Sequence, residues 1–262
     1  MGIVIPLPKR LEHGENVGLT EHLGEFRTRA LIAFGAVAVA FTIAYIEHTW
    51  LIKALNAPLA RTHVRPVTLG VAEPFMTSIK VSLYAAVAMA LPVILWQVWA
   101  YIAPAFGQAA RRSIVGFVVI GTGLFAIGLA FAYFVALPAA VHFLTGYDQK
   151  LYDIQVRAQD YYSFAAMSLL ATALVFEAPV LMLGLVRFGV LTPLKLRKNR
   201  RIGYVVVATV AVLLPGVDPV TTAMEAVPLA LLYEATIWMA VLFDRRWHPA
   251  VAEELCNDQI AS

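Results

Sequence analysis

A short charged segment near the N-terminus presents a carboxylate that could bind a cation. In a helix, Glu25 shares one face with His22 and Arg29, at spacings of i, i+3 and i+7, while Leu23 and Phe26 lie on another face. One interpretation is a solvated helix whose Glu25–Arg29 pair adds roughly 0.2–0.5 kcal/mol. The alternative is that Glu25 is a receptor for a cationic ligand.

Three further polar side chains interrupt long apolar runs, namely Gln97, Glu177 and Glu234. An ionised carboxylate in the middle of a lipid layer costs at least about 2.5 kcal/mol, so we expect Glu177 to be protonated, shielded or facing a water-filled groove. A hydrogen bond between helices is the alternative for Glu177, and it is the favoured interpretation for Gln97 and Glu234.

Other polar residues indicate structural roles. Asp218 precedes Pro219, a pair typical of a helix start, so capping is the favoured role for Asp218 and for Glu225 nearby. The six histidines are scattered, at positions 13, 22, 48, 63, 142 and 248. Cys256 is the only cysteine, which excludes an internal disulfide. We therefore expect no metal site and no cofactor.

The elements that position these residues are apolar blocks. The chain is 60% apolar and only 14% charged, with a mean hydropathy of +0.74, which exceeds what a soluble domain of this size needs for its core. Inside a bilayer, backbone amides must find their hydrogen-bond partners within a helix or a closed barrel. The alternation of apolar and polar residues that is typical of barrel strands is absent. The fold class is therefore all-α, a polytopic membrane protein. Six transmembrane helices are predicted near 30–46, 77–103, 113–141, 161–186, 202–214 and 226–243.

The basic residues predict the orientation of these spans. Fourteen Lys and Arg fall in the N-terminal segment, 104–112, 187–201 and the tail, against six in the segments facing them. By the positive-inside rule both termini are cytoplasmic and the protein belongs in the cytoplasmic membrane. The chain then divides into a cytoplasmic segment 1–29 with an interfacial helix, a membrane domain 30–243 and a cytoplasmic tail 244–262. No nucleic-acid motif accompanies the basic residues. The loop 187–201 could contact anionic lipid or a partner, but setting the topology is its favoured role.

The last two predicted spans are unusual. The block 202–214 makes about 20 Å of helix against a hydrocarbon layer of about 30 Å, and Glu234 makes the block 226–243 poorly apolar. Prolines in or near the other spans would bend their helices, at Pro92, Pro138, Pro179 and Pro228. We therefore expect a curved arrangement with short fifth and sixth spans.

A series of motifs runs through the chain in a fixed order. They are His22-Leu-Gly-Glu25-Phe-Arg27-Thr-Arg29, Ala57-Pro58-Leu59, Glu73-Pro-Phe75, Gln97-Val-Trp99-Ala-Tyr101-Ile-Ala-Pro104, Phe176-Glu177-Ala-Pro179 and Leu214-Pro-Gly-Val-Asp218. Together they resemble the TatC family of the twin-arginine protein translocase, from about residue 19 to about residue 246. The resemblance does not cover residues 1–18 or the tail.

The resemblance implies a receptor and core subunit that binds the twin-arginine signal peptides of folded proteins. It also implies assembly with single-span TatA/TatB-type subunits, self-association, and export driven by the proton-motive force. By resemblance the peptide-binding residues are Glu25, His22, Arg27 and Tyr101, Glu177 lines a docking surface for a partner helix or the signal peptide, and Pro58, Glu73 and Asp218 belong to an external cap. The paired N–H donors of a guanidinium group are bound best by a carboxylate. Glu25 can bind one of the two arginine side chains of such a signal peptide.

The chain departs from the family where many relatives carry an acidic residue before an arginine pair. Here Ala110 precedes Arg111 and Arg112. Either one acidic residue is enough to bind the twin-arginine peptide, or another side chain takes the place of the missing one. The candidates for this second group are Glu21, one turn before Glu25, and Gln108.

Two other function classes are weighed against the receptor. A proton-coupled small-solute transporter is expected to show internal repeats and paired broken helices, and only Glu177 and Glu234 hint at it. An intramembrane enzyme needs a nucleophile with a base, or a metal cluster, and neither pattern is present. The small-solute transporter therefore remains the alternative to the receptor function, and no enzymatic activity is expected.

Overall fold

The structure, a computed structural model, describes residues 19–60, 66–102, 108–148, 150–151, 154–215 and 218–247. Within these ranges the chain is helical, without strands, apart from an isolated parallel bridge between Val67 and Arg157. The predicted segment 1–18 and most of the predicted tail lie outside the described residues.

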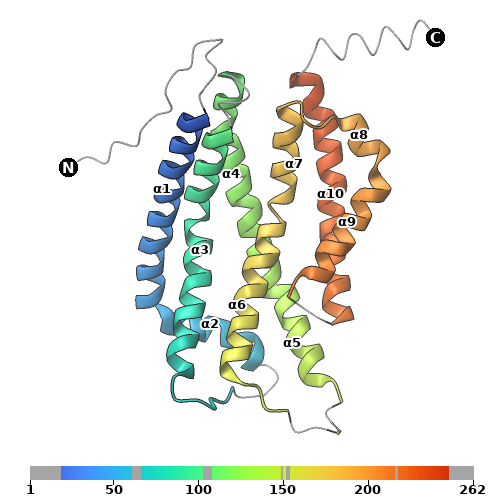
Figure 1. Cartoon of the computed structure of the whole chain (residues 1–262). Helices are drawn as coiled ribbons and strands as arrows, with labels where there is room; N and C mark the ends of the chain where they lie inside the picture. The colour runs from blue at the N-terminus through green and yellow to red at the C-terminus, as the bar shows by residue number, and fades with distance from the viewer. Residues whose placement is uncertain are drawn as a thin grey trace, which may run out of the picture.

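The helices follow one another in an antiparallel array (Figure 1). In chain order they are α1 Leu19–Ile46, α2 His48–Ala60, α3 Glu73–Ile102, α4 Gln108–Phe131, the π-helical turn η2 Ala132–Ala136, α5 Leu137–Gly146, α6 Ala158–Val175, α7 Ala178–Arg187, α8 Pro193–Lys198, α9 Arg200–Leu213 and α10 Pro219–Trp247.

Five helical segments of the described chain are long and apolar enough to cross a membrane. They are His22–Ile46, Glu73–Ile102, Ile114–Gly146, Ala158–Arg187 and Pro219–Leu242. The protein is therefore a multi-pass membrane protein. The short block predicted at 202–214 corresponds to α9, whose 14 residues make about 21 Å of helix.

One sequence-based expectation about helix length is wrong. The last span is not short, because α10 has 29 residues. Hydropathy missed its first turns since Thr221, Thr222 and Glu225 are polar, although they lie in the helix. The segment after the first span, which contains Pro58, forms the 13-residue helix α2.

The expected bends occur at two of the four prolines. The third span changes direction at η2, just before Pro138, and the fourth is broken at Phe176 and Glu177, just before Pro179 (Figure 1). Each proline follows its break because it cannot donate the amide bond that would continue the preceding turn. Pro92 and Pro228 instead lie inside the uninterrupted helices α3 and α10.

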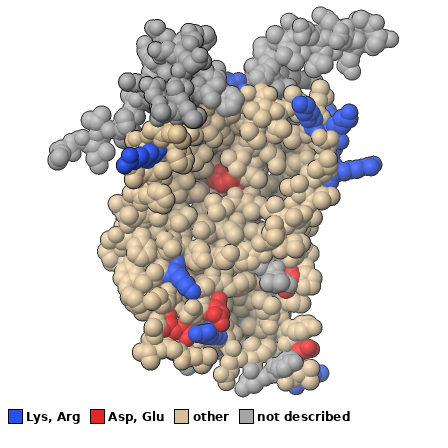
Figure 2. Space-filling model, in the orientation of Figure 1, with Lys and Arg blue, Asp and Glu red and all other residues tan. Residues whose placement is uncertain are grey.

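The two ends of the helix array differ. The start of α1, the end of α10 and the short helix α8, with Lys195, Arg197 and Lys198, lie at one end, which we call the basic end (Figure 1). The opposite end carries α2, the loop before α3 and the segment between α5 and α6, and we call it the α2 end. On the face shown in Figure 2, most charged side chains lie toward these two ends, and the surface between them is mainly uncharged.

The pairing of α1 with α3 positions the candidate site. The contact surfaces are small residues one turn apart, Ala40 and Ala44 on α1 and Ala86 and Ala90 on α3, all of them buried. Small residues let two helix backbones approach closely inside a membrane. The buried Ser82 hydroxyl of α3 also donates to the Ala44 carbonyl, at 3.4 Å. This seam continues to the basic end, where the polar residues of the two helices meet.

Candidate functional site

The α1–α3 seam carries a polar layer near the basic end. One carboxylate oxygen of Glu25, Oε1, accepts from both Nε and Nη2 of Arg29, at 3.0 and 2.6 Å. The Nη1 group of Arg29 donates to Oε1 of Gln97 on α3, at 3.4 Å. The Arg29 side chain is 13% exposed and the Glu25 side chain 33%. The pair expected from i,i+4 spacing is therefore a partly buried ion pair.

An aromatic layer lies one turn closer to the basic end. The rings of His22 and Tyr101 stack at 4.5 Å with an interplanar angle of 16°. Phe26 meets Tyr101 edge-on at 5.6 Å. Both His22 and Phe26 are exposed, and Tyr101 is half-buried. We call these three residues the aromatic shelf.

Three other predicted binding residues lie apart from these layers. Arg27 is exposed on α1. Gln108 is the first residue of α4, and Glu21 lies in the first turn of α1. The side chains of Glu21 and Gln108 are outside the part of the chain that the structure describes, so their candidacy stays a prediction.

Glu177 lies at the break between α6 and α7 and is only 4% exposed. Neither of its carboxylate oxygens has a hydrogen-bond partner among the described residues. Its carboxylate lies over Gly121 of α4 and beside Leu95 of α3, where a glycine leaves the space that a larger residue would fill. Glu177 is therefore a buried carboxyl group at a break in the fourth span, without a hydrogen-bond partner among the described residues.

Gln97 and Glu234 each join two helices. Gln97 links α3 to α1 through Arg29. Glu234 of α10 accepts from the Tyr204 hydroxyl of α9 at 2.5 Å, and its other oxygen lies 3.1 Å from Arg200. These contacts fit the helix-joining role favoured for both residues.

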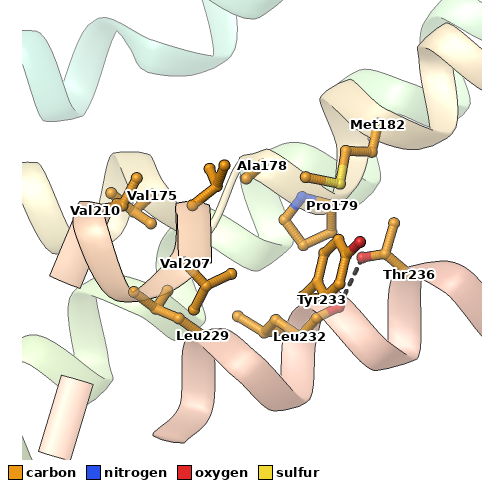
Figure 3. Close-up of a pocket in the computed structure, with 11 residues that line it drawn as sticks. Val175, Ala178, Pro179, Met182, Val207, Val210, Leu229, Leu232, Tyr233 and Thr236 are labelled. Carbon is orange, nitrogen blue, oxygen red and sulfur yellow. Dashed lines mark hydrogen bonds between the residues drawn. The ribbon is translucent and has the colours of Figure 1, made fainter. Parts of the chain in front are cut away.

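An apolar pocket lies beside the α6–α7 break (Figure 3). It is lined by α7, the short helix α9 and α10. Its labelled walls come from the end of α6 and from three helices, with Val175, Ala178, Pro179, Met182, Val207, Val210, Leu229, Leu232, Tyr233 and Thr236. Only Thr236 and Tyr233 bring polar atoms, and the Thr236 hydroxyl donates to the Leu232 carbonyl at 2.7 Å. The pocket therefore suits an apolar occupant.

Glu73 holds the α2 end together. Its Oε2 accepts from the amides of Leu69 and Gly70, at 3.0 and 3.1 Å. Its Oε1 accepts from Nε of Arg157, at 3.2 Å, and from the Gln159 amide, at 3.1 Å. The Glu73 side chain thereby fastens the loop before α3 to the start of α6, beside the bridge of Val67 and Arg157.

Asp218 caps α10. Its Oδ1 accepts from the Thr221 amide at 2.7 Å, three residues into the helix, with Pro219 between them. Glu225, by contrast, does not cap. It lies inside α10, where it accepts from the Thr172 hydroxyl of α6 at 3.2 Å.

The contacts of Pro58 reveal residues that the sequence did not suggest. Proline has no amide to donate to the carbonyl four residues earlier, that of Ala54. The Tyr133 hydroxyl of η2 donates to this carbonyl instead, at 2.9 Å. Tyr161 of α6 donates to the next carbonyl, that of Leu55, at 2.7 Å. The only signal in the sequence was tyrosine inside apolar blocks, which more often indicates membrane-interface positions.

Metal chemistry receives no support from the geometry. Among the described residues there is no group of three or more His, Cys, Asp or Glu that could hold a metal ion. What the seam and the break offer is recognition chemistry, with one partly exposed carboxylate beside aromatic rings and one buried carboxylate among apolar walls.

Comparison with known proteins agrees with this architecture. The family model of the Sec-independent protein translocase protein TatC matches residues 21–228. The Sec-independent protein translocase protein TatC of Desulforapulum autotrophicum is 33% identical over 235 residues, 88% of this chain and 87% of the relative. The Aquifex aeolicus protein of the same description is 34% identical, covering 87% of this chain and 96% of its own.

Solved structures match as well. A crystal structure of the twin arginine translocase receptor TatC in DDM superimposes with a TM-score of 0.75 at 32% identity, covering 84% of this chain and 99% of that one. The fold and these matches define a multi-pass helical membrane protein of the protein-translocase class. The chain belongs to the TatC family. A small-solute transporter, the alternative drawn from the sequence, is not favoured by these matches.

Proposed function

We propose that this chain is the receptor and core subunit of a twin-arginine translocase. In this role it binds the twin-arginine signal peptides of folded proteins, and the proton-motive force drives their export across the cytoplasmic membrane. The observation that carries the proposal is Glu25, a partly exposed carboxylate on the α1–α3 seam at the basic end. Guanidinium groups are bound most strongly by such carboxylates when water is partly excluded.

The proposed arrangement in the membrane has six spans, with α9 as a short fifth span and both termini in the cytoplasm. Two features support it: the surplus of Lys and Arg in the segments of one side, six of them from 187 to 201, and the shared end of the α1 start and the α10 end (Figure 1). The basic end is then cytoplasmic. Glu25 accordingly faces the compartment in which a precursor is made.

Binding of a twin-arginine peptide tests the receptor proposal. The purified protein in detergent is titrated with a fluorescent twin-arginine peptide and with a peptide carrying two glutamines instead. We expect Glu25→Gln to weaken twin-arginine binding by at least about tenfold, because the charged acceptor is lost. Glu47→Gln is the matched control, since Glu47 is exposed at the other end of α1. Equal binding of both peptides to the unsubstituted protein would exclude the receptor role.

The partners proposed are single-span subunits of the TatA/TatB type, in addition to other copies of this chain. The supporting observation is the buried Glu177, whose carboxylate oxygens have no hydrogen-bond partner among the described residues and could accept a bond from a polar group of a partner helix. Crosslinking of such a subunit to positions near the α6–α7 break is expected to fall in Glu177→Gln, with export falling in parallel. Unchanged crosslinking and export would assign Glu177 to packing alone.

A further inference from the structure

The polar layer of the seam leaves one acceptor for a ligand. Both bonds from Arg29 end on Oε1 of Glu25, and among the described residues no donor meets Oε2. Arg29 is held from its other side by Gln97 and is the more buried member of the ion pair. Displacing Arg29 would leave a partly buried cation without its carboxylate, next to a cationic ligand, which is unfavourable. Glu25 therefore has room for one arginine of a peptide and not for two.

The aromatic shelf has a suitable position for the second arginine. Tyr101 is one turn beyond Gln97 on α3, so it lies about 6 Å from the polar layer along the helix axis. On α1, His22 comes three residues before Glu25, and Phe26 directly follows Glu25. Neighbouring residues of a peptide have Cα atoms about 3.8 Å apart. Their flexible side chains can therefore reach both layers together.

The chemistry of the shelf selects guanidinium. A planar, weakly hydrated guanidinium group stacks on aromatic faces, whereas an ammonium group keeps its water more strongly. His22 and Phe26 are exposed, with Phe26 56% exposed, and the partly covered Tyr101 joins them into one surface. This surface carries no carboxylate of its own, and Ala110, in the first turn of α4, supplies none.

We propose that the two arginines of the ligand are bound differently, one by Oε2 of Glu25 and the other by stacking on the aromatic shelf of His22, Phe26 and Tyr101. The inference rests on the proposed receptor function. It names a second subsite and a preference for arginine over lysine or glutamine in it.

The test compares two peptides on the full-length protein. One carries Arg-Arg, and the other carries a single arginine with glutamine at the second position, tested in both orders. We expect the unsubstituted protein to prefer Arg-Arg by about fivefold, within the range of cation–π contacts. Tyr101→Leu should remove this preference, so that both peptides bind equally, while Tyr101→Phe should retain it because the ring remains. Tyr147→Leu, an exposed tyrosine at the α2 end, is the matched control.

The outcomes separate the two proposals. Equal weakening of both peptides by Tyr101→Leu, or no change, would overturn the shelf and leave the role of Glu25 intact. Loss of the preference in Tyr101→Phe as well would also overturn it, because stacking would not be the cause. Should Tyr101→Leu fail to fold, His22→Ala provides the same comparison from α1. If the unsubstituted protein does not bind Arg-Arg above a Gln-Gln peptide, the receptor function itself is excluded.

Discussion

The Glu177 carboxylate lies against Gly121, so closely that a Cβ atom at position 121 would be 2.8 Å from Oε2 of Glu177. The same Cβ would lie 3.1 Å from Cδ1 of Leu95. Contacts this short require a neighbour to move. The glycine of α4 therefore sets how deeply the carboxyl group at the α6–α7 break can be buried.

Gly121→Ala is expected to push the Glu177 side chain out of its position. The added methyl group should cost about 1–3 kcal/mol of stability, as overpacking does in other proteins, and should lower export activity. Unfolding in detergent and export of a reporter measure the two effects. Gly123→Ala is the matched control on the same helix, because nothing lies within 4 Å of its Cβ and alanine favours a helix. Equal behaviour of the two variants would show that the Glu177 position is not constrained by α4.

Tyr133 replaces the amide that Pro58 lacks, through its bond to the Ala54 carbonyl. Tyr133→Phe should therefore destabilise the protein by about 1 kcal/mol, because a carbonyl inside the array loses its donor. Pro58→Ala supplies an amide in place of the hydroxyl. In that background Tyr133→Phe should cost less than half as much, as measured by unfolding of the four proteins in a double-mutant cycle. If the stability losses of Tyr133→Phe and Pro58→Ala simply add in the double variant, the Tyr133 hydroxyl does not replace the amide that Pro58 lacks.

Glu73 is predicted to be the most sensitive residue of the α2 end. Glu73→Gln places an NH2 group against backbone donors, and we expect a loss of about 2–4 kcal/mol. Trypsin should then cut after Arg157 faster than in the unsubstituted protein. Arg157→Gln should cost only about 1 kcal/mol, since this side chain is largely exposed and the three backbone bonds of Glu73 remain. Similar losses of stability in both variants would mean that the Glu73–Arg157 ion pair contributes more than the backbone hydrogen bonds of Glu73.

The proposed topology is testable with the single natural cysteine. Cys256 belongs to the tail predicted to be cytoplasmic. A membrane-impermeant maleimide should label it in inverted vesicles and leave it unlabelled in intact spheroplasts. Val71, fully exposed in the loop before α3, provides the control as Val71→Cys in a Cys256→Ser background. Its labelling should be the reverse, and labelling of both positions from the same side would contradict the topology.

The sequence contained enough information to predict the spans because hydropathy and helix formation are local properties. The predicted block 77–103 and α3 at Glu73–Ile102 differ by a few residues, and the short block 202–214 is α9 at Arg200–Leu213. Local reasoning failed where polar residues belong to a helix that packing stabilises. The polar first turns of α10 and the proline in α2 are examples, since Thr172 and Tyr133 satisfy groups there from other helices.

The sequence by itself determined the order and positions of the apolar helices, the family motifs and the presence of Glu25 and Glu177. Only the tertiary structure decided what those carboxylates face. Arg29 meets Gln97 across 68 positions of sequence, Tyr101 stacks on His22, and Glu177 lies over Gly121. Such contacts depend on which helices pair and at what rotation. Hydropathy, which says only that a segment is apolar, does not carry that information.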